Sequence, residues 1–190
     1  AAVVVAGGTL IVTNNPISIG LNSSNAQGTL TLNNGTIVAG VGTAAFAGSP
    51  NNIVVGANGA NGKLIVNGGQ ILNGHDLWLG QNAGANAEFD LNGGVVQAAS
   101  VATGGTTPAT SIANFNGGTL LAATNTADYL VGITANVLGG GLTLDDNGYA
   151  VTLASTALVA GDANNGGLVK KGSGVVYLNA ANTYSGTTTV

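Results

Sequence analysis

The sequence predicts an all-β fold, a right-handed parallel β-helix in which each coil takes about 24 residues. One observation is a motif written twice, at 53–69 and again at 77–94. A second is the series of short apolar runs that alternate with polar residues and end at Gly or Asn, as strands do. The third is a composition that is 45% hydrophobic but only 5% charged. A repeat of this length cannot bury its apolar face alone, so successive copies must stack.

Both copies of the motif follow the same order. Each reads apolar-x-apolar-Gly, a loop of Asn, Gly and Ala, a second apolar-x-apolar run, and then Asn-Gly-Gly. Alternate residues of a strand face opposite sides. We therefore expect Leu64, Val66, Phe89 and Leu91 to point inward and to stack on the coils above and below, whereas Asp90 points outward.

The corners of the coils are predicted from Asn and Gly, which tolerate the positive φ of a sharp turn. Asn side chains that recur at one corner can hydrogen-bond in a ladder along the axis. The longer step from Asn33 to Asn67 predicts an extra loop near Gly42–Asn52, and the chain length predicts roughly eight coils. The corners fall at 34–35, 67–69, 92–94 and 116–118.

The spacing of the Asn-Gly-Gly repeat is lost after residue 124. The stretch 137–153 predicts a strand, a polar hairpin-like corner at Asp145-Asp146-Asn147-Gly148, and another strand. We expect one β-solenoid over 1–190, with Asn-Gly-Gly coils over 1–124 and coils of a second kind over 125–190.

Charge and composition limit the partners. The chain has no Arg, only three Lys and a net charge of −4, which disfavours a nucleic-acid partner. No apolar run reaches the length of a membrane helix, so no membrane insertion is expected. The Asp145–Gly148 segment lacks the spacing of a calcium loop and favours a polar turn. His75 is the only His, which gives neither a triad nor a metal cluster, so we expect no cofactor and no metal.

Two stretches could carry a function on the outer surface. Glu88 and Asp90 share one face near Lys63, either as a catalytic carboxylate pair or as a solvated ion pair between coils. The ion pair is favoured, and we expect no enzymatic activity. Trp78 lies at an outward position, where it could stack on a sugar ring of a polysaccharide or contact a long loop or a neighbouring subunit.

The last 25 residues carry a family resemblance. The run 166–190 contains Gly-Gly-Leu-Val-Lys-Lys-Gly-Ser-Gly and ends in Asn-Thr-Tyr-Ser-Gly-Thr-Thr-Thr-Val. It resembles the passenger-associated repeat of bacterial autotransporters. That resemblance implies a right-handed β-helix on the outside of a Gram-negative-type cell that serves as a stalk, an adhesin or a matrix component.

The two ends of the chain predict self-association. Both are β-prone and carry no charge or Pro that would blunt a strand edge. In the family the repeat runs on into a segment similar to 5–10, so each end would complete the other. We expect head-to-tail joining into a surface stalk, a fibre or a biofilm-matrix filament, unless the chain is a fragment trimmed at arbitrary points. The residues expected at this joint are Val3, Val4, Val5, Thr187, Thr188, Thr189 and Val190.

The functional prediction is therefore a non-enzymatic, extracellular structural β-solenoid of a bacterial cell surface. The alternative is an adhesin module that binds polysaccharide through the face near Trp78.

Overall fold

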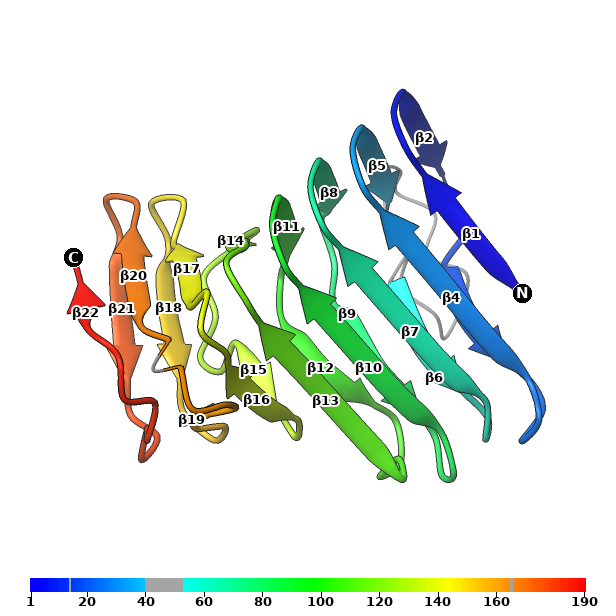
Figure 1. Ribbon diagram of the computed structural model, residues 1–190. Coiled ribbons are helices and arrows are strands. Elements are labelled where there is room, and N and C mark those ends of the chain that lie inside the picture. The colour runs from blue at the N-terminus through cyan, green and yellow to red at the C-terminus, as the bar shows by residue number, and fades with distance from the viewer. Residues whose placement is uncertain (14, 40–52, 165) are drawn as a thin grey trace.

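The computed structural model describes residues 1–13, 15–39, 53–164 and 166–190. The chain winds into a parallel β-solenoid of about six turns, each of about 25 residues (Figure 1). The predicted fold class is confirmed. No helix occurs in the described residues, so none of them forms a helix that could cross a membrane. The loop predicted near 42–52 lies outside the described residues.

The first and second sheets run the length of the molecule. The first sheet consists, in spatial order, of β1 (Ala2–Val5), β4 (Gln27–Leu32), β7 (Asn61–Val66), β10 (Asn86–Leu91), β13 (Thr110–Phe115), β16 (Thr134–Val137) and β19 (Leu158–Ala160). The second sheet consists of β2 (Thr9–Val12), β5 (Thr36–Ala39), β8 (Gln70–Asn73), β11 (Val95–Ala98), β14 (Thr119–Ala122), β17 (Leu142–Asp145), β20 (Leu168–Lys171) and β22 (Thr188–Thr189).

The third side of the solenoid is divided between two sheets. The third sheet consists of β3 (Ile17–Leu21), β6 (Ile53–Ala57), β9 (Leu77–Gln81), β12 (Val101–Gly104) and β15 (Leu130–Val131). The fourth sheet pairs β18 (Ala150–Leu153) with β21 (Val175–Leu178), and one isolated bridge joins Thr126 to Val151. The side is interrupted where the sequence rhythm changes at residue 125, while the first and second sheets continue through this point.

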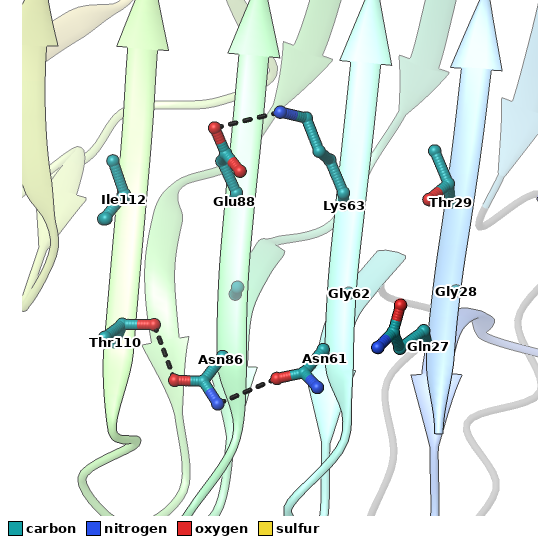
Figure 2. A pocket seen from close by; sticks show the side chains of 11 residues that line it. Gln27, Gly28, Thr29, Asn61, Gly62, Lys63, Asn86, Glu88, Thr110 and Ile112 are labelled. Atoms are coloured by element: carbon teal, nitrogen blue, oxygen red, sulfur yellow. Dashed lines mark hydrogen bonds and ion pairs between the residues drawn. The ribbon is translucent and has the colours of Figure 1, made fainter. Parts of the chain in front are cut away.

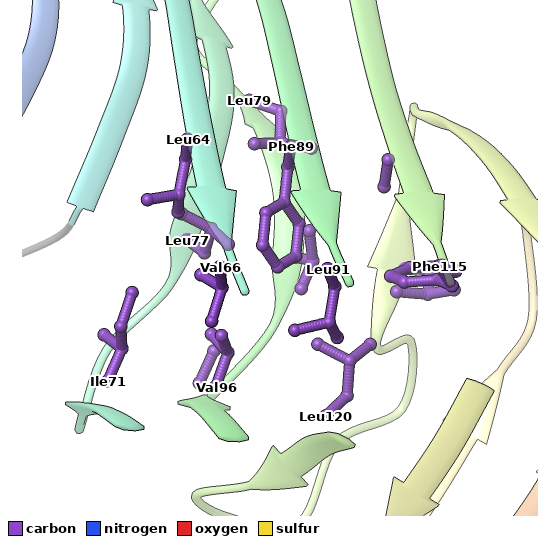
Figure 3. Packing of buried hydrophobic residues seen from close by; sticks show 14 of the residues in the cluster. Leu64, Val66, Ile71, Leu77, Leu79, Phe89, Leu91, Val96, Phe115 and Leu120 are labelled. Atoms are coloured by element: carbon purple, nitrogen blue, oxygen red, sulfur yellow. The ribbon is translucent and has the colours of Figure 1, made fainter. Parts of the chain in front are cut away.

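The core is one apolar column shared by successive coils, as expected from the alternation. Leu64 pairs with Phe89 and Val66 with Leu91, and all four side chains are fully buried. Asp90, between Phe89 and Leu91, is only partly buried on the outer face. Phe89 is followed by the much smaller Ala113 in the next coil, and Figure 3 shows Leu64, Phe89 and Leu91 packed in the interior.

Two phenyl rings contact each other in the middle of this column. The rings of Phe89 and Phe115 meet edge to face, with centroids 6.4 Å apart and an interplanar angle of 86°. This arrangement places the positive ring edge against the negative ring face. The contact joins β10 to β13 inside the core.

Two expectations about the coils are wrong. There are about six turns rather than eight, and one coil is lengthened, so that Asn33 and Asn67 lie 34 positions apart. The Asp145–Gly148 corner is not hairpin-like, since β17 and β18 on either side of it lie in different sheets. Both strands pair in parallel with other coils, so the corner turns the chain from one side of the solenoid to the next.

Candidate functional site on the outer face of the first sheet

Amide ladders run along the solenoid axis at three places. The sequence predicted such a ladder at only one corner. In each ladder, a side chain of a later coil donates to the amide oxygen of the preceding coil. Asn58 donates to Asn22 at 2.7 Å and Asn82 to Asn58 at 2.6 Å. At the Asn-Gly-Gly corner, Asn67 donates to Asn33 at 2.8 Å and Asn92 to Asn67 at 2.9 Å.

The third ladder borders a groove on the outer face of β4, β7, β10 and β13 (Figure 2). Asn86 donates from Nδ2 to Oδ1 of Asn61 at 2.9 Å, and the Thr110 hydroxyl donates to Oδ1 of Asn86 at 2.9 Å. The groove has a volume of about 350 Å³. Gln27 extends the line of amides on β4, and Thr29, Lys63, Glu88 and Ile112 form the opposite wall.

The groove separates two rows of outward side chains, because the residues between these rows face the interior. Gly28, Gly62 and Ala87 occupy successive coils there and face the interior. A Cβ at Gly28 would lie 2.9 Å from the carbonyl carbon of Ile19, and one at Gly62 would lie 2.8 Å from that of Val55. The close approach of the third sheet therefore requires glycine here.

Lys63 bridges two carboxylates on the groove's second wall. Its Nζ lies 3.0 Å from Oε1 of Glu88 and 2.8 Å from Oδ2 of Asp90. Burial lowers the pKa of Lys63, but the hydrogen bonds and charges of Asp90 and Glu88 outweigh it, so that the pKa is raised above 10.5. The predicted ion pair between coils is confirmed.

The charged cluster continues as a line of amides toward the C-terminal coils. Asn114 donates to Oδ1 of Asp90 at 2.8 Å, and Asn136 donates to Oδ1 of Asn114 at 2.9 Å. The Asn114 amide also donates to Oε1 of Glu88 at 3.3 Å. The negative charge of Asp90 is thus neutralised by Lys63 and hydrogen-bonded by the next coil.

The polar corner at Asp145–Gly148 is a turn, and it holds a group that sequence reasoning missed. Asp146 is fully buried, and its Oδ2 lies 2.6 Å from Nζ of Lys170. Its Oδ1 accepts the backbone N–H groups of Gly148 at 2.8 Å and of Gly174 at 2.7 Å. Lys170 donates also to the carbonyl oxygens of Gly172 and Gly174.

This arrangement, the Asp146 clasp, gives a physical role to three residues of the C-terminal repeat. Lys170 neutralises the buried carboxylate, and Gly172 and Gly174 bring the chain against it. A Cβ at Gly172 would collide with Oδ1 of Asp146. The Lys-x-Gly-x-Gly spacing was the signal in the sequence, but it does not reveal which acid of an earlier coil the Lys meets.

The remaining candidate residues are dispersed. His75 lies in a turn in which the Asn73 side chain donates to its carbonyl oxygen at 2.9 Å. In the described part of the chain, no three His, Cys, Asp or Glu side chains are grouped as a metal would require.

Trp78 points outward between the buried Leu77 and Leu79, at the position expected. Its side chain is half-buried, and a Cβ at Gly104 would lie 2.5 Å from its ring. The indole therefore lies over the backbone of β12, which requires glycine beneath it. Val54, which pairs with Trp78 from β6, is 2% exposed.

The residues expected at the joint lie on the two end faces. Val3 and Val4 on β1 are 53% and 61% exposed, and Val5 is half-buried. At the opposite end, 187–190 are exposed, with β22 at the edge of the second sheet. Thr188 shares a short hydrogen bond of 2.6 Å with the Tyr184 hydroxyl, and Tyr184 packs against the core.

The fold defines the class of protein, a parallel β-solenoid. Comparison with family models, with curated proteins and with solved structures gave no match. The resemblance of 166–190 to the autotransporter repeat therefore remains a prediction from the sequence.

Proposed function

We propose that the chain is a non-enzymatic structural β-solenoid of the bacterial cell surface, a unit of a stalk, a fibre or a biofilm-matrix filament that lengthens head to tail. One observation carries the proposal. The apolar column is not closed at the end face formed by β1, β2 and β3, where Val3 and Leu10 lie at inward positions of the first coil and are 53% and 41% exposed. Apolar surface of this kind is typical of a site that another molecule or segment covers.

The geometry of the end face favours another coil as the covering element. A cavity of about 240 Å³ opens there, lined mainly by apolar side chains that include Val3, Leu10, Val12 and Ile17. The strands β1, β2 and β3 are each paired on one side only. A further coil would pair all three edges and cover the cavity at once. In a head-to-tail joint, that coil is the end of a second copy, formed by β19, β21 and β22.

Such a joint is heterologous, because the two surfaces that meet are different. A contact of this kind that does not close into a ring produces a filament. The extracellular location rests on the resemblance of 166–190 to the autotransporter repeat alone.

The proposal is tested by placing charge on the open end face. We expect Val3→Lys combined with Leu10→Lys to abolish assembly in concentrated solution, because two ammonium groups cannot enter an apolar joint without a large desolvation cost. Light scattering measures the mass of the assemblies. Ile65→Lys is the matched control, since Ile65 lies on a side face and its variant should assemble as the unmodified chain does.

Two results would overturn the proposal. The first is an unmodified chain that stays monomeric at every concentration, and the second is a Val3→Lys, Leu10→Lys variant that assembles normally. Circular dichroism of the variant, compared with that of the Ile65→Lys control, shows that the fold is intact.

A further inference from the structure

The groove on the first sheet has the hydrogen-bonding character of a binding site. It is bordered by Gln27, Asn61, Asn86 and Thr110, one from each of four successive coils. Neighbouring parallel strands are about 4.8 Å apart. The groove therefore presents the same kind of polar group at a short, regular interval along the solenoid axis.

The ladder leaves much of this capacity unused. An amide has two N–H donors and an oxygen that can accept two hydrogen bonds. Asn86 uses one donor toward Asn61 and accepts one hydrogen bond from Thr110. Within the described part of the chain, the Asn61 and Gln27 amide nitrogens donate to no other group, and all of these side chains are at least partly exposed. Donors and acceptors thus lie side by side along the groove.

The charges nearby select against an anionic ligand. The second wall carries one ammonium, Lys63, and the carboxylate of Glu88, and Asp90 lies next to them. This cluster is negative overall, and so is the whole chain at −4. Like charges at a binding surface reduce both affinity and association rate. The ligand that fits is uncharged.

We propose that this groove binds an uncharged, hydroxyl-rich polysaccharide that lies along the solenoid axis, with successive sugars over successive coils. A hydroxyl both donates and accepts, which is what alternating amide N–H and C=O groups require. Ile112 and the stem of Lys63 supply the small apolar surface that a sugar ring covers. The groove lies on a different side of the solenoid from Trp78, and it shares only Gly28 and Thr29 with the cavity of the open end face.

The absence of an aromatic platform among the groove residues has a consequence for affinity. Each sugar is held by a few hydrogen bonds, and each bond contributes little once water is displaced. Binding therefore depends on several sugars being held together, as in other multivalent contacts. We expect affinity to rise steeply with the number of sugars.

The test uses side-chain amide signals in ¹H–¹⁵N NMR spectra of the whole chain, recorded at a concentration at which it is monomeric. The probes are the six-sugar oligomers of β-1,4-linked and α-1,4-linked glucose, with a six-sugar oligomer of galacturonic acid as the acidic comparison. We expect at least one glucose oligomer to shift the signals of Gln27, Asn61 and Asn86, and the acidic oligomer to leave them unchanged. The two-sugar form of the glucose oligomer that binds should bind much more weakly than the six-sugar form.

Matched variants locate the site. Asn61→Ala with Asn86→Ala should weaken binding about tenfold or more, because two ligand hydrogen-bonding groups are lost. Asn67→Ala with Asn92→Ala removes the same kind of ladder from the Asn-Gly-Gly corner and should leave binding unchanged. Trp78→Ala should also bind normally.

Three outcomes would overturn the proposal. One is that neither glucose oligomer shifts the groove amides. Another is that the galacturonic acid oligomer shifts them equally. The third is that Trp78→Ala abolishes binding while the groove variant retains it, which would assign the glycan to the face near Trp78 instead. None of these outcomes bears on head-to-tail assembly, since the monomer is measured.

Discussion

At the scale of single residues, the Asp146 clasp contains the only carboxylate that is fully buried in the described residues. A buried carboxylate is costly unless it is paired and hydrogen-bonded. Asp146 meets both conditions, with Lys170 at 2.6 Å and two backbone N–H groups. The clasp also crosses a coil boundary, because Asp146 follows β17 whereas Lys170 lies on β20. It therefore ties the last coils together by charge as well as by packing.

The clasp predicts an acid-sensitive stability. Burial raises the pKa of Asp146, but the Lys170 ammonium and the N–H groups of Gly148 and Gly174 hold it below 3.8. A carboxyl whose folded-state pKa is depressed stabilises the fold above its unfolded-state pKa, and the contribution is lost as the pH falls through the folded-state value. We expect Asp146→Asn to cost about 3 kcal/mol at neutral pH and to reduce the loss of stability below pH 3.8. Urea unfolding as a function of pH measures both.

Glu88→Gln is the matched control for Asp146→Asn. It breaks an ion pair of similar length at an exposed position, where such pairs contribute less than about 1 kcal/mol. Equal effects of the two substitutions would contradict the assignment of a buried, structural role to Asp146.

At the scale of the elements, each coil is held in register by its corner. Gly35, Gly69 and Gly94 occupy one corner in successive coils, and all three have positive φ, between 70° and 94°. A Cβ at Gly69 would lie 2.5 Å from the carbonyl oxygen of Gly35. The turn therefore needs glycine both for its backbone conformation and for the closeness of the preceding coil.

Two alanine substitutions separate these requirements. Gly8 has a φ of 74°, almost the same as the 73° of Gly69, but no atom lies within 4 Å of the place of its Cβ. We expect Gly8→Ala to cost about 1 kcal/mol through backbone strain alone. Gly69→Ala should cost roughly 1 kcal/mol more, because its Cβ also displaces the neighbouring coil. Thermal unfolding of the two variants measures the difference, and equal costs would contradict close stacking of the coils.

Periodic features at this scale could be predicted from the sequence, and non-periodic ones could not. The burial of Leu64 and Phe89 follows from strand alternation, which is a local property. The contact between Trp78 and Gly104 and the pairing of Asp146 with Lys170 depend on which coil lies beside which.

The candidate groove was predictable in part. The sequence placed Lys63, Glu88 and Asp90 together on the outer face, because the two copies of the motif align them. It did not show that Gly28 and Gly62 allow the third sheet to approach closely beneath the groove, since an isolated glycine in a strand does not reveal what approaches it.

At the scale of the whole molecule, stability is expected to be distributed along the axis. In a solenoid each coil contacts only its neighbours, so the stability is a sum of coil and interface terms. Phe115 lies in the middle of the shared column, where its ring meets Phe89 and its strand joins β10 to β16. Loss of this ring should weaken the adjoining interfaces more than the distant ones.

Site-resolved hydrogen exchange of Phe115→Ala tests most directly whether one apolar lining joins successive coils. The substitution should cost about 3–5 kcal/mol locally. We expect protection to fall most in β10, β13 and β16 and progressively less toward both ends, with little change in β4 and β20. Protection that falls equally in every strand, or that does not fall in β10 and β16, would contradict a column of coils held together by their shared core.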